Sequence, residues 1–200
     1  MVSEHRMSER IGVRVPLVAA MAVNQAQSMN FMSDAIAHLG VVSRRIKCLT
    51  VADDFSYECV DFIADFGIGG AYVSRLLDRA VTFRGHPKEV NTENGPEFTC
   101  RAFMTWIQTH GIKHILIEPG CPTRNAYIES FNGTFRDECL DESCFESLEQ
   151  ARQIIAKWRI DSNETRPHSS CGRIPSATFA LNRQLTGDSK HEGKTNAGIS

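Results

Sequence analysis

Hydrophobic and polar positions alternate along the first half of the chain with the period of strands. Ser28 to Ile36 carries short apolar runs, Arg45 to Phe55 alternates before it turns acidic, and Tyr57 to Ala64 repeats the pattern. Such alternation is typical of strands with one buried face. We therefore predict three consecutive strands, with a tight hairpin link at 55–57 between the second and the third.

After Gly67-Ile68-Gly69-Gly70 the apolar positions change to the period of helices. A first helix is predicted around 72–81, because apolar residues recur at helical spacing until Gly85 and Pro87. A short strand at 89–92, a helix opened by Gly95-Pro96 and ended at Gly111, and a strand at 112–117 follow. Two further helices are predicted, one over 125–140 and one that Ser147 caps and that ends near 165.

This order of elements predicts an α/β fold. Three strands followed by alternating helices and strands indicate a mixed sheet of about five strands flanked by helices. We assign residues 25–182 to one domain that includes the C-terminal helix. Residues 1–24 lack periodicity and are expected to form a poorly ordered leader or a remnant, and the polar segment 183–200 a disordered tail.

Composition narrows the class of protein. The net charge of −2 argues against a chain that coats nucleic acid non-specifically, although it allows local basic patches. Seven cysteines without a CxxC pair give poor support to a disulfide framework or a structural zinc site, and favour free thiols in a reducing cytoplasm. No apolar run reaches the ~20 residues that span a bilayer, so no membrane partner is expected.

Three oxygen-bearing residues, Asn30, Glu93 and Glu129, fall where such a sheet can bring them together. Asn30 lies on the first predicted strand, Glu93 at the end of the fourth, and Glu129 on the helix after the fifth, with thirty-five residues between Glu93 and Glu129. Phosphoryl transfer uses divalent ions held by carboxylates, and hard cations such as Mg²⁺ prefer oxygen ligands. Acidic residues near strand ends are common, however, and surface carboxylates without a role are the usual case.

The surrounding motifs resemble those of bacterial insertion-sequence transposases whose integrase-like catalytic cores carry a DDE metal triad. The matching stretches are Ser28–Phe31, Thr50–Ser56, Glu93–Phe98, Glu118–Thr123, Asn125–Gly133 and Arg166–Ser170. The resemblance covers about three quarters of the chain, and only the combination of motifs is specific. It implies a ribonuclease-H-like fold, two Mg²⁺ or Mn²⁺ ions, and transposition and integration of DNA by metal-dependent phosphoryl transfer.

The same resemblance assigns site residues and exposes departures. Asn30, Glu93 and Glu129 occupy the catalytic and metal-binding positions, but the family has Asp at the first two. DNA contacts are implied for a further set: Arg124, Asn125, Tyr127, Arg136, Arg166 and His168. For His168 the alternative is that it orders the turn after the last helix. Gln27, Cys121, Arg124 and Ser162 also depart from the family pattern, which suggests sequence decay.

Charge arithmetic predicts weak or absent catalysis. Three carboxylates would bring −3 to two dications, whereas Asn30, Glu93 and Glu129 bring −2. One hypothesis is therefore an impaired transposase core. The alternative is an inactive remnant that binds DNA or co-assembles with an active transposase, or has no selected role. Partners are expected to be transposon ends and target DNA, an upstream helix-turn-helix protein or segment, and further copies of the chain.

Overall fold

The computed structural model describes residues 20–38, 41–117 and 122–192, and within these it places the side chains except at 38, 41–43, 122–127 and 187–192. Five strands form one sheet in the order β3-β2-β1-β4-β5. The first three, β1 (Ala26–His38), β2 (Val41–Asp53) and β3 (Cys59–Asp65), form an antiparallel meander. The last two, β4 (Glu89–Glu93) and β5 (Lys113–Ile117), run parallel to β1. The predicted mixed sheet is confirmed.

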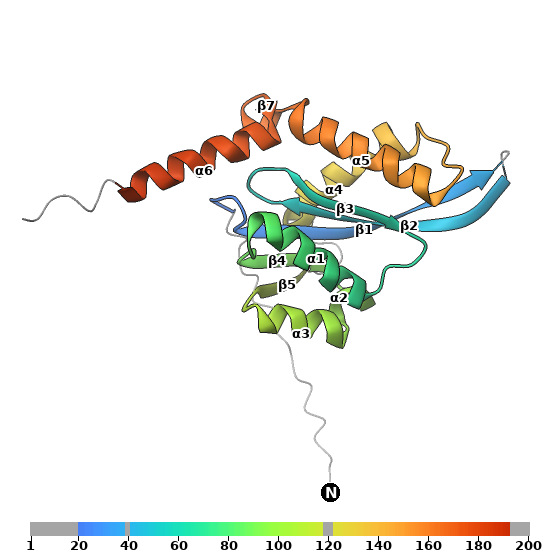
Figure 1. Ribbon diagram of the computed structural model, residues 1–200, viewed down its shortest axis with the longest axis horizontal. Coiled ribbons are helices and arrows are strands. Elements are labelled where there is room, and N and C mark those ends of the chain that lie inside the picture. The colour runs from blue at the N-terminus through green and yellow to red at the C-terminus, as the bar shows by residue number, and fades with distance from the viewer. Residues whose placement is uncertain (1–19, 39–40, 118–121, 193–200) are drawn as a thin grey trace, which may run out of the picture.

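Helices cover both faces of the sheet (Figure 1). On one face, α1 (Gly70–Arg84) and α3 (Arg101–Thr109) pack on side chains that include Met29, Leu49 and Val90. On the other, α4 (Pro122–Phe135) and α5 (Leu148–Glu164) pack on Met32 and Cys48. Because neighbouring residues of a strand point to opposite faces, β1 and β2 contribute to two separate hydrophobic cores.

The helix predicted after Gly95-Pro96 is divided in two. A short α2 (Pro96–Thr99) ends at Cys100, whose backbone is extended with φ −69° and ψ 156°, and α3 begins at the next residue. The start of α1 packs closely against this break. A Cβ added to Gly70 would lie 2.1 Å from the Cys100 Sγ and 2.4 Å from the Glu97 carbonyl oxygen, so the contact requires glycine.

The helix predicted over 125–140 begins earlier and changes its pitch. It starts as α4 at Pro122, and its last turn is a π-helix, η1 (Arg136–Leu140). Phe135, Cys139 and Leu140 are all buried in the core under α4 and α5. The wider turn therefore keeps this end of the helix on the sheet, and single π turns of this kind frequently occur at functional sites.

The C-terminal region contains more structure than the sequence predicts. The Ser147 Oγ accepts a hydrogen bond from the Gln150 N–H at 3.1 Å, as expected for the cap of α5. A two-stranded sheet of β6 (Pro167–His168) and β7 (Ile174–Pro175), with a 3₁₀ turn η2 (Ser169–Cys171) between them, leads to α6 (Ser176–Glu192). We expected a disordered tail from residue 183, but α6 continues to Glu192 and projects from the body (Figure 1). Residues 193–200 of the expected tail lie outside the described residues.

At the other end, Asn24 is integrated into the fold although it closes the segment expected to be a leader. Its backbone N–H donates to the Asp53 Oδ2 at 2.6 Å, and its side chain donates to the carbonyls of Arg84, Gly85 and His86. Residues 1–19 of that segment lie outside the described residues. Within the described part of the chain, no helix is both long and apolar enough to cross a membrane.

Six of the seven cysteines lie among the described residues, and all six are free thiols. This agrees with the expectation from the sequence, while Cys121 lies outside the described part. Burial raises the pKa of the Cys48 and Cys59 thiols to about 12 and that of Cys139 and Cys171 to about 11. These thiols are therefore protonated at neutral pH and behave as apolar core groups.

Candidate active site

Asn30 and Glu93 occupy neighbouring positions on two adjacent parallel strands. In the β1–β4 pair Ser28 lies opposite Asn91 and Met29 opposite Thr92, so the next residues along the two strands are Asn30 and Glu93. Adjacent strands are about 4.8 Å apart. Since side chains alternate, Asn30 and Glu93 share the face that α4 covers, and they lie where β4 ends and the chain leaves the sheet.

The side chain of Asn30 is buried and incompletely hydrogen-bonded. It is 8% exposed, and among the described residues its Oδ1 has no hydrogen-bond partner. The Asn30 backbone carbonyl accepts a hydrogen bond from the Thr50 Oγ1 at 3.2 Å. A buried acceptor without a donor costs about 1–3 kcal/mol. This oxygen is therefore suited to a ligand that brings positive charge or a donor.

Glu129 projects from the helix that lies over these strands. Its neighbour Ile128 is fully buried, whereas Glu129 is exposed. One turn further along α4, Asn132 is buried, and its Oδ1 accepts a hydrogen bond from the Thr50 Oγ1 at 3.0 Å. Residues three apart are neighbours on a helix surface. Glu129 thus lies one turn from the point where α4 contacts the strand pair that carries Asn30.

The three candidate side chains include only two carboxylates. Among the described residues, no three His, Cys, Asp or Glu side chains are grouped so that they could hold a metal ion. An amide oxygen at position 30 leaves the arrangement one charge short of three carboxylates. All three side chains still offer oxygen atoms, which suit Mg²⁺ or Mn²⁺.

Two other acidic residues near this site are engaged elsewhere. The Asp53 carboxylate is fully buried and accepts hydrogen bonds from the N–H groups of Asn24, Phe55 and Ser56, so it holds the turn after β2. Burial raises the pKa of Asp54, while hydrogen bonds from Ser28 and Asn91 oppose that shift. Both carboxylates are thus hydrogen-bonded within the fold, although the buried Asp54 Oδ1 has no hydrogen-bond partner among the described residues.

The basic and polar residues expected at DNA fall into three groups. Arg124, Asn125 and Tyr127 lie in α4, but their side chains are outside the described part of the chain. Arg136 is the first residue of η1 and is exposed, with its Nη2 3.5 Å from the Ser33 carbonyl oxygen. Arg136 is therefore exposed at the end of α4, next to β1.

Arg166 and His168 are instead engaged within the fold. The Arg166 guanidinium forms ion pairs with Glu138 and with Asp161, the latter at 2.6 Å. The His168 Nε2 lies 2.8 Å from the Ser162 carbonyl oxygen. These contacts fasten the end of α5 to η1 and to the β6–β7 turn, which supports the structural alternative for His168.

Another part of the Glu93–Phe98 motif has a structural role that the sequence analysis did not identify. Glu97 forms an ion pair with Lys47 of β2, and the Lys47 ammonium lies 3.9 Å from the centroid of the Phe31 ring. The Phe31 ring in turn packs against Phe98, with centroids 5.1 Å apart. The motif therefore anchors the chain just after Glu93 to the middle of the sheet. Glu97 stands between a proline and a phenylalanine in the sequence, but its ion-pair partner Lys47 is fifty residues away, so the sequence alone did not indicate the pair.

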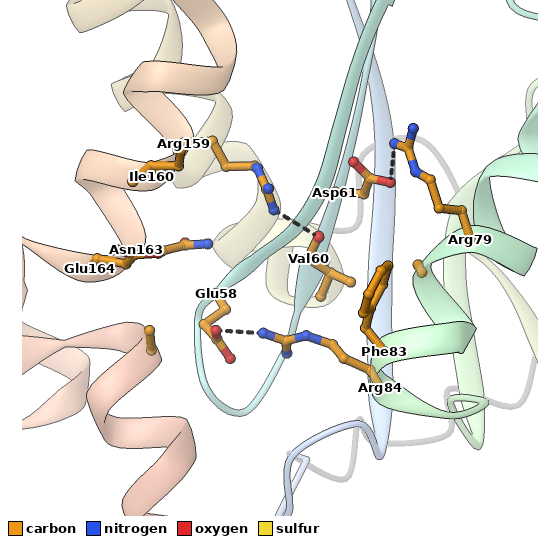
Figure 2. A pocket seen from close by; sticks show the side chains of 12 residues that line it. Glu58, Val60, Asp61, Arg79, Phe83, Arg84, Arg159, Ile160, Asn163 and Glu164 are labelled. Carbon is orange, nitrogen blue, oxygen red and sulfur yellow. Dashed lines mark hydrogen bonds and ion pairs between the residues drawn. The ribbon is translucent and has the colours of Figure 1, made fainter.

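A groove of about 370 Å³ lies at the β3 edge of the sheet, between α1, β3 and α5 (Figure 2). Two of its acids are paired: Arg84 pairs with Glu58 at 2.5 Å and Arg79 with Asp61 at 2.7 Å. Arg159 donates to the carbonyls of Cys59 and Val60, on the open edge of β3. β3 is separated from β4 by two strands. This groove therefore lies apart from the candidate positions Asn30 and Glu93 on β1 and β4.

Comparison with known proteins identifies the family of the chain. Residues 23–122 match a family model described as integrase core domain, and residues 110–175 match a second model with the same description. The chain is 60% identical over 182 residues to the insertion element IS476 uncharacterized 39.2 kDa protein of Xanthomonas euvesicatoria, covering 90% of the chain and 51% of that protein. It is 50% identical over 186 residues to the insertion element IS407 uncharacterized 31.7 kDa protein of Burkholderia multivorans, covering 92% and 66%. The chain thus spans about half of the first relative and about two thirds of the second.

Solved structures show the same fold at low sequence identity. The HTLV-2 integrase catalytic core domain in complex with magnesium superimposes with a TM-score of 0.62 at 16% identity, covering 80% of this chain and 98% of that one. A chain of the simian T-cell lymphotropic virus intasome gives a TM-score of 0.64 at 15% identity, covering 82% and 56%. The predicted ribonuclease-H-like fold is confirmed. Because the first family model spans half of the chain and the second extends it through residue 175, the chain belongs to the integrase core domain family.

Proposed function

We propose that the chain is the core of an insertion-sequence transposase, which acts on DNA by metal-dependent phosphoryl transfer and is catalytically impaired. Its family and the insertion elements named for its relatives support the class of reaction. The impairment is inferred from the residues at positions 30 and 93.

One observation carries the proposal: a buried oxygen at Asn30, without a hydrogen-bond partner among the described residues, lies next to Glu93 on the sheet face that α4, the helix of Glu129, covers. The Asn30 Oδ1 and the carboxylates of Glu93 and Glu129 would hold divalent cations, as oxygen ligands from two strands and a helix. When bound, such ions would stabilise the charge that develops on a transferring phosphoryl group. The protein's own contribution is to hold the three side chains on a rigid sheet and helix.

Two changes account for the impairment. Asn30 removes one of three negative charges, and a neutral amide stabilises adjacent dications much less than a carboxylate does. Glu93 keeps its charge but is one methylene longer than Asp, which moves its oxygens by about 1.5 Å. Misplacement of about 1 Å can cost roughly 10²-fold in rate. Strand transfer is therefore expected to be lost or nearly lost.

The second candidate function is non-enzymatic: a folded copy that binds DNA ends or co-assembles with an active transposase. The intact fold around an altered triad position favours it, because Asn30 and its neighbours remain packed under α4. Arg124, Asn125, Tyr127 and Arg136 would supply contacts to DNA from one helix and its π turn. End recognition would come from a helix-turn-helix protein or segment, and further copies of the chain would assemble on the DNA.

A DNA joining assay tests both functions. The chain is incubated with Mg²⁺ or Mn²⁺ and duplexes that carry the ends of the insertion element, beside the variants Glu129→Gln and Arg136→Ala. Turnover comparable to that of an active transposase, abolished by Glu129→Gln, would contradict the impairment. Binding should weaken steeply with salt and should be reduced by Arg136→Ala. An absence of binding at low salt would exclude the non-enzymatic candidate.

A further inference from the structure

The dipeptide Asn-Gly occurs twice in the chain, at Asn94-Gly95 and at Asn132-Gly133. Glycine lacks a Cβ, so the backbone nitrogen after such an asparagine can approach the side-chain amide without hindrance. In a flexible chain both sites would therefore be prone to lose the side-chain amide. In the folded chain the two sites have different surroundings.

Asn94 lies in the bend that follows β4, and its side chain is exposed. The Gly95 N–H makes no hydrogen bond to any other described residue. The Gly95 carbonyl, in contrast, accepts bonds from the N–H groups of Phe98 and Thr99, both at 3.1 Å. Among the described residues the reacting nitrogen thus has no acceptor, and the exposed bend that carries it lies between the end of β4, where Glu93 pairs with Ile117, and the start of α2.

Asn132 has the opposite environment. It is 7% exposed, it lies inside α4, and its Oδ1 accepts a hydrogen bond from the Thr50 Oγ1 at 3.0 Å. Within a helix the following N–H is directed along the helix axis towards a carbonyl one turn earlier. Reaction at Asn132 would therefore require local opening of α4.

We propose that Asn94 is a site of spontaneous deamidation in the folded chain, while Asn132 is protected. The Gly95 nitrogen loses its proton to solvent base and attacks the Asn94 Cγ. The Cγ–Nδ2 bond breaks, ammonia leaves, and a five-membered succinimide forms. Water then adds to one of the two ring carbonyls and opens the ring to aspartate or isoaspartate. The net change is the uptake of one water and the release of one ammonia.

The product carries a new carboxylate next to Glu93. At that position it lies within a Debye length of the proposed cation site, about 8–10 Å at physiological salt. A unit negative charge at this range should tighten divalent cation binding by about two- to tenfold. This second effect rests on the proposed function, whereas the deamidation itself does not.

Peptide mapping by mass spectrometry tests the modification. The full chain is aged in mildly alkaline buffer, both folded and in urea, and digested with trypsin. Cleavage after Lys88 and Arg101 isolates the first site, and cleavage after Arg124 and Arg136 isolates the second. In the folded chain Asn94 should convert at least about tenfold faster than Asn132, because α4 must open first. In urea the two rates should converge.

Gly95→Ala is the matched variant. The φ of −88° and ψ of 151° at Gly95 suit alanine, and the added Cβ would lie 3.1 Å from the Glu97 Oε2 and 3.6 Å from the Phe98 ring. It should slow the reaction at Asn94 and leave Asn132 unchanged. Equal rates at the two sites in the folded chain, or an Asn94 that reacts only in urea, would overturn the proposal.

Calorimetric titration with Mg²⁺ separates the two inferences. Asn94→Asp should bind Mg²⁺ more tightly than Asn94→Gln, a variant that keeps a neutral amide. If Asn94 deamidates but none of these chains binds Mg²⁺, the proposed cation site fails and the modification stands. If Mg²⁺ binds but Asn94 stays intact, the modification fails alone.

Discussion

Replacing Asn30 by Asp tests whether this position forms part of a cation site. The new carboxylate would be about as buried as the present side chain, which is 8% exposed, and would face Glu93 across the β1–β4 pair. Burial and a neighbouring like charge both disfavour the ionised form. Without a metal ion, Asn30→Asp should therefore lower the free energy of unfolding at neutral pH by about 1–3 kcal/mol.

A divalent cation should reverse that loss. At a separation of 4 Å and an effective dielectric constant near 20, two unit charges interact by about 4 kcal/mol. Desolvation of the carboxylate offsets part of this interaction free energy. We therefore expect the Mg²⁺ affinity to rise at least about tenfold, equivalent to ~1.4 kcal/mol. At an Mg²⁺ concentration about 100 times the Kd, binding adds roughly 2.7 kcal/mol to the stability.

Thermal unfolding with EDTA and across an Mg²⁺ series measures both effects. The melting temperature of Asn30→Asp should begin below that of the parent chain and rise more steeply with Mg²⁺. Asn30→Leu is the control, since it removes the unpartnered oxygen without adding charge and should show no Mg²⁺ response. The double variant with Glu93→Asp should respond most strongly. A response of Asn30→Asp no larger than that of the parent chain would refute the placement of a cation at this position.

Three further predictions concern the surroundings of the site. Thr50→Val leaves the Asn132 amide oxygen without its donor and should lower the free energy of unfolding by about 1–3 kcal/mol in urea titrations. Thr50→Ser keeps the hydroxyl and should retain most of the parent stability. Lys47→Met removes the partner of a largely buried carboxylate and should destabilise the chain more than Lys113→Met, whose exposed ion pair is worth less than about 1 kcal/mol; equal losses would contradict the anchoring role. Burial raises the pKa of Asp54 above its ordinary 3.8, so the folded chain binds this proton more tightly than the unfolded chain does. The stability that this proton contributes is present at low pH and is lost as the pH rises through the folded-state pKa. Asp54→Asn should accordingly be more stable than the parent chain at neutral pH and lose that advantage below about pH 4, as urea unfolding at several pH values would show.

Local patterns in the sequence determined the elements and the family. The short apolar runs over Ser28–Ile36 and the helical spacing after Gly70 are properties of residues close in the chain, which is why β1 and α1 could be predicted from them. The helix cap at Ser147 involves only residues 147–150, and it was predicted correctly. The motifs around Glu93 and Glu129 identified the family, because their combination along the chain is specific.

Contacts between distant residues decided the rest. The β1–β4 register places Asn30 beside Glu93, although sixty-two residues separate them, and only the packed α4 buries Asn30 and gives Thr50 its partner. The division of the helix at Cys100 is accompanied by the close approach of Gly70, and the ion pairs of Arg166 depend on η1 and α5 meeting. Short stretches of the sequence determine the helix or strand propensity and the periodicity of apolar residues. Strand register, burial and the partners of charged groups arise only when the sheet and its helices pack, because each is a property of residues that the chain brings together from far apart.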